Sequence, residues 1–164
     1  MGFLQDYDLI VTAPDNFPTR YLINDAAVLL GKPNIYSAVF RFEGQVTVFK
    51  PKEGPCYRCL YPEPPPPGTL PPASQVGVMG AMVGTLGTLQ ATEAIKLITG
   101  AGEPLVGKMV LYDSMDMSFK KLRVRKDPAC PICGENPTIH ELQDYEKFCG
   151  VQVAATQTPL LGPN

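Results

Sequence analysis

The sequence predicts an α/β fold in which helices pack against a mixed sheet of parallel and antiparallel strands. Three observations support this. A short apolar run typical of a buried parallel strand precedes an amphipathic helix, a second and longer helix lies mid-chain, and two stretches have the pattern of antiparallel hairpins. With 164 residues, 45% of them hydrophobic and 18% charged, the chain has the size and composition of one globular domain.

The first strand and the first helix are expected near the N-terminus. Residues 7–12 (YDLIVT) are the apolar run, and the turn after them leads into a helix that Asp15 or Asn16 can cap and that Gly31 ends. The expected apolar face of this helix consists of Tyr21, Leu22, Ala26, Leu29 and Leu30.

A hairpin and a proline-rich segment follow. Residues 34–42 and 45–50 read as two strands, with Glu43 and Gly44 forming the turn between them. Residues 54–72 include an unbroken run of prolines from Pro64 to Pro67, which excludes a helix interior or a central strand. We therefore expect an extended crossing segment there, and a plain linker between two domains is the alternative.

One long helix is expected over residues 77–100. Gly80, Gly84 and Gly87 each cost it about 1 kcal/mol relative to alanine. We therefore expect another backbone to approach closely, in a tightly packed core or in a dimer seam.

The C-terminal third begins with a second hairpin. Residues 108–113 and 119–125 alternate apolar and polar side chains, which predicts two paired strands. Residues 138–150 are expected to give a short strand and a short helix. Residues 151–164 have neither caps nor periodicity and read as a frayed tail.

Charge and hydropathy exclude some classes of function. The net charge is −2 and the sequence pI is about 5.4, which argues against a nucleic-acid binder, and the basic run from Lys120 to Lys126 fits the solvated face of a strand. The longest apolar stretch, residues 76–99, is interrupted by glycines and charges, so we expect a buried helix and no membrane partner. No secretory signal is visible, and we expect a cytoplasmic protein, in which cysteines more often bind metals or catalyse than form disulfides.

Four of the five cysteines form two Cys-x-x-Cys pairs. Cys56 with Cys59 and Cys130 with Cys133 predict a structural zinc ion held by four thiolates, which would join two distant parts of one fold. Two disulfides, a redox motif or an iron–sulfur cluster are the alternatives, and neither pair precedes a convincing helix as redox motifs do. The fifth, Cys149, is expected to be a small buried residue, and the only histidine, His140, to lie on the surface.

Five stretches in this order resemble the MoeB/ThiF-type adenylyltransferases, relatives of the ubiquitin-activating enzymes. They are residues 15–21 (DNFPTRY), 40–45 (FRFEGQ), 54–63 (GPCYRCLYPE), 87–96 (GTLQATEAIK) and 127–134 (DPACPICG). The resemblance implies a Rossmann-like α/β domain that dimerises. It implies that residues 1–150 are the C-terminal portion of such an adenylation domain, and 151–164 a tail.

The resemblance also implies a function. Members of the family use ATP and magnesium to adenylate the C-terminal glycine of a ubiquitin-like sulfur-carrier protein, in molybdopterin (molybdenum cofactor), thiamine or tRNA thiolation pathways. Asp15, with Asn16 beside it, would bind magnesium and the ATP phosphates, the cysteines would hold zinc, and a crossover loop over about residues 68–78 would lie near the carrier's tail.

The sequence departs from the family pattern at three places. No Gly-x-Gly-x-x-Gly turn precedes Asp15, so we expect the nucleotide-binding half to be absent and the chain to be unable to adenylate alone. Ala73 stands where the family's crossover loop carries a cysteine, and a methyl group cannot act as a nucleophile. Thr12 stands where an additional aspartate usually ends the strand.

Two functions therefore remain open. The chain is expected to be part of an adenylating enzyme, functional only beside its nucleotide-binding half. The alternative is a non-catalytic, zinc-stapled module that dimerises or binds a ubiquitin-like carrier. A zinc-ribbon nucleic-acid binder is disfavoured by the acidic pI.

Overall fold

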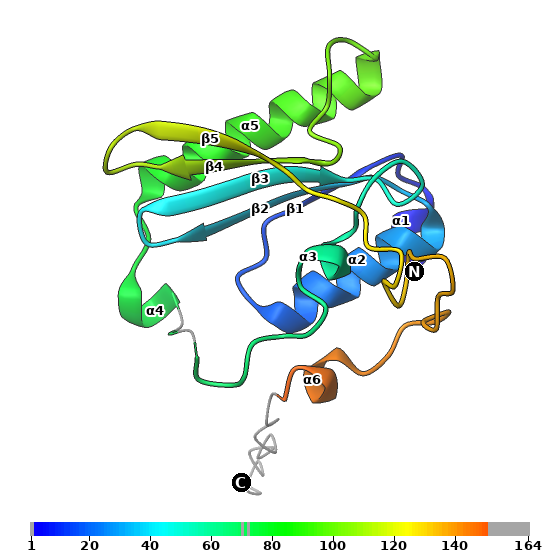
Figure 1. Cartoon of the computed structure of the whole chain (residues 1–164). Helices are drawn as coiled ribbons and strands as arrows, with labels where there is room; N and C mark the ends of the chain where they lie inside the picture. Colours follow the sequence, from blue (N-terminus) through cyan, green and yellow to red (C-terminus); the bar gives the residue numbers. More distant parts are fainter. Residues whose placement is uncertain (1, 70, 72, 151–164) are drawn as a thin grey trace, which may run out of the picture.

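A five-stranded sheet forms the centre of the computed structural model, which describes residues 2–69, 71 and 73–150 (Figure 1). The strands are β1 (Ile10–Thr12), β2 (Asn34–Phe40), β3 (Glu43–Phe49), β4 (Lys108–Asp113) and β5 (Ser118–Arg123), and they lie side by side in that order. β1 and β2 are parallel, and the other neighbours are antiparallel. The predicted α/β class with a mixed sheet is confirmed.

The helices lie on both faces of this sheet. They are α1 (Gly2–Gln5), α2 (Phe17–Leu30), α3 (Tyr57–Leu60), α4 (Ala73–Val76), α5 (Gly80–Thr99) and α6 (Tyr145–Phe148). The long α5 covers one face, and α2, α3 and α6 lie on the other (Figure 1). Among the described residues, no helix is both long enough and apolar enough to cross a membrane.

Aliphatic side chains fill the space between α5 and the sheet. Ile35, Val46 and Val48 point toward Met82 and Leu86 of the helix, and all are buried. Gly44 lies within β3, and a Cβ at that position would stand 2.3 Å from Cδ1 of Leu86. The predicted turn at Glu43 and Gly44 is therefore wrong, since both residues pair with β2.

The first hairpin instead turns at Arg41 and Phe42, two residues before the predicted position. Arg41 adopts a φ of 55°, in the left-handed region that only a few per cent of non-glycine residues occupy. The turn is held from outside, since Ser114 donates from both its backbone nitrogen and its hydroxyl to the carbonyl of Phe42, each over 2.9 Å. The predicted second hairpin is confirmed as β4 and β5.

Helix α2 begins and ends as its sequence predicts, and its expected apolar face is confirmed in part, since Tyr21 and Ala26 are buried. Its buried residues are Tyr21, Asn24, Asp25, Ala26 and Ala27. Leu22, expected on the apolar face, is 39% exposed, because the helix turns polar side chains toward a buried network described below. Gly31 ends the helix with a φ of 67°.

The glycines of α5 face open space. A Cβ at Gly80, Gly84 or Gly87 would meet nothing within 4 Å, so no backbone of the described residues approaches them. The expected packing against another backbone within this core is therefore wrong, and the dimer seam is not tested. Residues 138–150 form α6 without the expected strand, and the short helices α1 and α4 were not predicted. Residues 151–164, the predicted tail, lie outside the described residues.

Candidate functional site

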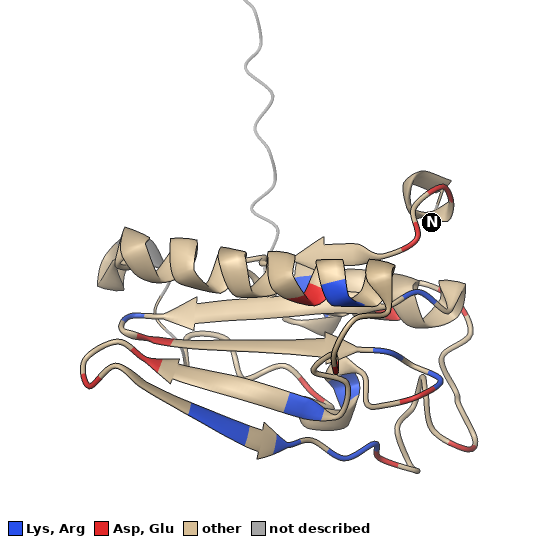
Figure 2. Cartoon of the chain, turned by 90° about the horizontal axis from the view of Figure 1, so that it is seen from above, with Lys and Arg blue, Asp and Glu red and all other residues tan. Residues whose placement is uncertain are grey.

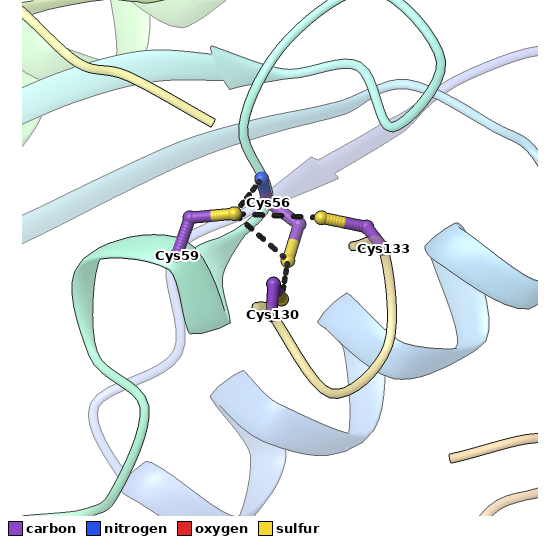
Figure 3. A group of neighbouring side chains, drawn as sticks. All are labelled: Cys56, Cys59, Cys130 and Cys133. Atoms are coloured by element: carbon purple, nitrogen blue, oxygen red, sulfur yellow. Dashed lines mark hydrogen bonds between the residues drawn. The ribbon is translucent and has the colours of Figure 1, made fainter. Parts of the chain in front are cut away.

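The four paired cysteines meet at one end of the α2 side of the sheet (Figure 3). Cys56 caps the short helix α3 and Cys59 lies within it, whereas Cys130 and Cys133 lie in the loop that follows β5. Their Sγ atoms all lie within 4.8 Å of one another, and Cys56, Cys130 and Cys133 are buried. None of the chain's cysteines, all of which are described, forms a disulfide.

The spacing of the sulfur atoms fits a four-coordinate cation. A tetrahedron of thiolates around zinc, at the usual bond length of about 2.3 Å, has sulfur–sulfur edges of about 3.8 Å. The Sγ atoms of Cys56 and Cys59 are 3.9 Å apart, those of Cys56 and Cys130 3.6 Å, and those of Cys59 and Cys133 3.4 Å. The chemistry and the geometry of this donor set are those of a structural metal site.

Hydrogen bonds among the four sulfurs shift the pKa values of individual thiols in opposite directions. Hydrogen bonds from Cys133 and then from Cys56 hold the pKa of Cys130 well below its ordinary value. Hydrogen bonds to Cys130 and then to Cys133 raise the pKa of Cys56. Because four thiolates this close repel one another, full deprotonation requires a cation, and metal binding releases protons.

The backbone around the second pair is shaped for this site. A Cβ at Gly134 would stand 2.4 Å from the carbonyl oxygen of Pro128 and 2.5 Å from that of Cys130, so only glycine fits this turn. The nitrogen of Gly134 donates to the carbonyl of Cys130 over 2.9 Å. Cys56 of the first pair precedes the one-turn helix α3, which has only four residues and is not the convincing helix of a redox motif.

A buried ion pair lies beside the first pair of cysteines. Nε and Nη2 of Arg58, the residue before Cys59, donate to Oδ1 and Oδ2 of Asp25 over 2.9 Å and 2.8 Å. The side chains of the two residues are 2% and 0% exposed. The sequence analysis missed this pair. The available signal was a charged residue, Asp25, next to apolar positions of α2.

The predicted nucleotide-site residues lie at the end of β1. Asp15 and Asn16 follow β1 in an exposed loop, and the Oδ1 atom of Asn16 accepts from the nitrogen of Thr19 over 2.9 Å. Asn16 is therefore the cap of α2, and Asp15 is not. The carboxylate of Asp15 accepts only from Nδ2 of Asn16, over 3.1 Å, among the described contacts.

Two other segments extend toward the same end of the sheet. β1 and β2 are parallel, so Asp15 and Arg41 both follow the carboxyl end of a strand, but Thr12 lies opposite Tyr36 and Arg41 is therefore five residues further along. The end of the predicted crossover loop also arrives here, because Val78 pairs with Arg41. Gln90 of α5 donates to the carbonyls of Thr12 and Ile35, over 2.8 Å and 2.9 Å, and so fixes the end of β1.

The predicted crossover loop, residues 68–78, includes the short helix α4. Helix α4 begins at Ala73, which stands at the family's cysteine position. Residues 70 and 72 of this loop lie outside the described residues. The expectations for Cys149 and His140 are confirmed, since Cys149 is buried and His140 is exposed.

Known proteins resemble this chain over most of its length. The protein named sulfur carrier protein adenylyltransferase of Thermus thermophilus is 54% identical over 157 residues, which cover 93% of this chain and 58% of that protein. The probable adenylyltransferase/sulfurtransferase MoeZ of Mycobacterium tuberculosis is 50% identical over 155 residues, 92% of this chain and 38% of that protein. The chain thus spans little more than half of the first relative and less than half of the second.

Solved structures share the fold at low identity. Escherichia coli MccB superimposes with a TM-score of 0.64 at 20% identity, over 77% of this chain and 39% of that chain. A heterocyclase superimposes with a TM-score of 0.66 at 21% identity, over 80% of this chain and 21% of that chain. The model of the ThiF family matches residues 2–132. The chain therefore belongs to the ThiF family, as the five sequence stretches predicted.

Proposed function

We propose that this chain is part of an ATP-dependent adenylyltransferase that activates the C-terminus of a ubiquitin-like sulfur-carrier protein. The observation that carries the proposal is the 54% identity, over 157 residues, to a protein named for that activity. The arrangement at the end of the sheet supports it, since an exposed carboxylate follows a parallel strand, where α/β folds bind ligands.

The residues of this chain would form two sites, one for a structural zinc ion and one for the magnesium that accompanies ATP. Cys56, Cys59, Cys130 and Cys133 would hold a structural zinc ion that joins α3 to the loop after β5. Asp15 would ligate the magnesium ion that accompanies ATP. When bound, this ion neutralises charge on the phosphates. Asn16 would act beside it by fixing the start of α2.

The glycine-rich turn that cradles phosphates is not among these 164 residues. We therefore propose that they do not adenylate alone, and that another polypeptide segment supplies the nucleotide cradle. The lack of a thiol at Ala73 removes the covalent step that the resemblance implies there.

A second candidate function is a non-catalytic module that dimerises or binds a carrier. The observation that favours it is the outward face of α5. Val83, Ile95 and Ile98 are 49%, 60% and 71% exposed there, beside the three open glycines. The helix carries only one acidic and one basic residue, and its ribbon is almost free of charge (Figure 2).

ATP–pyrophosphate exchange in the presence of a sulfur-carrier protein tests the enzymatic proposal. The 164-residue chain is expected to give none. A chimera, in which this chain replaces the matching region of the Thermus thermophilus relative, is expected to be active. Asp15→Asn in the chimera is expected to lower exchange by roughly 100-fold or more, because a metal clamp on phosphate contributes several kcal/mol.

Asp8→Asn is the matched control, because Asp8 is also exposed but precedes β1, at the other end of the strand. It is expected to leave the rate unchanged. Exchange by the 164-residue chain alone would refute the proposed incompleteness. A folded, metal-loaded chimera without exchange, which still binds the carrier, would favour the second candidate.

A further inference from the structure

The two residues between Cys56 and Cys59 connect this turn to α2, one through its side chain and the other through its backbone. Arg58 lies between Cys56 and Cys59, and its guanidinium is paired with both carboxylate oxygens of Asp25. The backbone nitrogen of Tyr57, also between the cysteines, donates to Oδ1 of Asn24 over 2.8 Å. The position of the metal-binding turn therefore fixes the position of Arg58.

The same ion pair holds the short helix α6. The hydroxyl of Tyr145 donates to Oδ2 of Asp25 over 2.9 Å, across 120 residues of chain. The guanidinium carbon of Arg58 lies 4.7 Å from the ring centre of Phe148 and 4.8 Å from that of Tyr21, so the cation lies between an α6 ring and an α2 ring. An isolated four-residue helix is not stable in water, so α6 depends on these contacts.

Cys149, just after α6, reports whether the helix is docked. It is 7% exposed and packs among Tyr21 and the other aromatic rings of this face. Burial raises the pKa of its thiol, against the weaker opposite effect of Arg58. A docked α6 therefore leaves this thiol both covered and protonated, and slow to react.

We propose that occupancy of the four-cysteine site controls the docking of α6 through Arg58, Asp25 and Tyr145. Without a cation no bond joins the four sulfurs, and the one-turn helix that carries Arg58 loses its anchor to the loop after β5. Asp25 then loses its guanidinium partner in a buried position, and Phe148 loses the cation against its ring. Tyr145 is left bonded to an unpaired buried carboxylate, which weakens the docking of α6. Metal loss thus releases α6 and uncovers Cys149, a response that the adenylation chemistry does not require.

The first test compares the zinc-loaded chain with the same chain after chelation. Alkylation of each cysteine is followed by mass spectrometry, together with hydrogen exchange of residues 145–150 and of the β4–β5 hairpin. Alkylation of Cys149 and exchange of residues 145–150 are expected to rise about tenfold or more on metal removal, while the hairpin stays protected. Unchanged reactivity of Cys149 in the metal-free chain would overturn the proposal.

A second test does not depend on how the metal-free chain folds. Tyr145→Phe removes one hydroxyl that donates to a buried carboxylate and keeps the ring. In the zinc-loaded variant, alkylation of Cys149 is expected to be about tenfold faster, since such a hydrogen bond to a charged group changes equilibria by that order.

Because coupling between two events is reciprocal, the variant must also bind zinc more weakly by the factor that undocking α6 implies. Competition with a chromophoric chelator measures this factor. Tyr7→Phe removes a hydroxyl from a tyrosine that is 63% exposed and should change neither quantity. Equal zinc affinity in Tyr145→Phe and Tyr7→Phe would overturn the coupling. Absence of any zinc in the unaltered chain would overturn the zinc site itself.

Discussion

The face of the sheet under α5 and the face under α2, α3 and α6 bury different kinds of side chain. Under α5 the core consists of aliphatic residues such as Ile35, Val46 and Leu86. On the other face, aromatic rings surround a buried ion pair, and four sulfurs lie at one end. Stabilisation is therefore spread over many small contacts on the first face and concentrated in a few polar groups on the second.

Substitutions on the two faces are expected to lower stability in different ways. Removing methyl groups from an aliphatic core costs free energy in proportion to the atoms lost and the cavity left behind. Removing one member of a polar cluster leaves its partners unsatisfied. The second face also joins very distant parts of the chain, since Asp25 and Tyr145 are 120 residues apart. We expect graded losses under α5 and abrupt losses at the cysteines.

The largest effect is expected from Cys56→Ser. Metal binding at such a four-cysteine site contributes free energy to folding, and its loss is expected to loosen the face that carries the cysteines while the core under α5 stays folded. Elemental analysis is expected to find about one zinc per unaltered chain and almost none in the variant. Thermal unfolding of the variant is expected to begin at a much lower temperature.

Cys149→Ala is the control for this experiment, because Cys149 is buried on the same face but is not one of the four clustered sulfurs. It should keep its zinc and lose little stability. A Cys56→Ser chain that retains a full equivalent of zinc would contradict the four-thiolate site. Equal losses in both variants would remove the contrast between the two faces.

A smaller and graded effect is expected under α5. Leu86→Ala should lower the free energy of unfolding by ~2–5 kcal/mol, because Leu86 is 1% exposed and its removal leaves a cavity. Gly44→Ala alone should cost ~1–3 kcal/mol through overpacking, since the new Cβ would overlap Leu86. Urea unfolding of both single variants measures these costs.

The double variant sharpens the test. With Leu86 shortened, the methyl group of Gly44→Ala occupies part of the space that the leucine leaves. The double variant is therefore expected to lose less than the sum of the two single losses, as neighbouring sites do when they share a cavity. Strictly additive losses would show that Gly44 and Leu86 are not in contact.

The sequence predicts most of the secondary structure and misses what depends on packing. The cysteine pairs, the second hairpin and both ends of α2 follow from local signals such as spacing, alternation and Gly31. The turn of the first hairpin does not, because Gly44 resembles a turn glycine unless Leu86 is known to lie against it. Local patterns carry no information about such tertiary contacts.

The residues of the candidate site also differ in whether the sequence can predict them. The four clustered cysteines are recognisable from spacing alone, since two Cys-x-x-Cys pairs are typical of zinc sites. Asp25 and Tyr145 are not, because 120 residues separate them and each has an ordinary role on its own helix. The sequence also leaves the choice between Asp15 and Asn16 as cap open, which only the position of the first helical turn decides.

The smallest effect is expected at the cap of α2, which belongs to the second face but lies outside its polar cluster. Asn16→Ala should lower the free energy of unfolding by about 1 kcal/mol, because it removes the acceptor for the nitrogen of Thr19. Asp15→Ala should cost less than about 0.5 kcal/mol, as an exposed residue without a capping bond does. Urea unfolding of both variants compares these losses. A larger loss at Asp15 would mean that its carboxylate serves the helix and is not free for a metal ion. A small loss at Asn16 and a smaller one at Asp15 would mean that the second face also loses stability gradually at residues that do not contact the sulfurs or the ion pair.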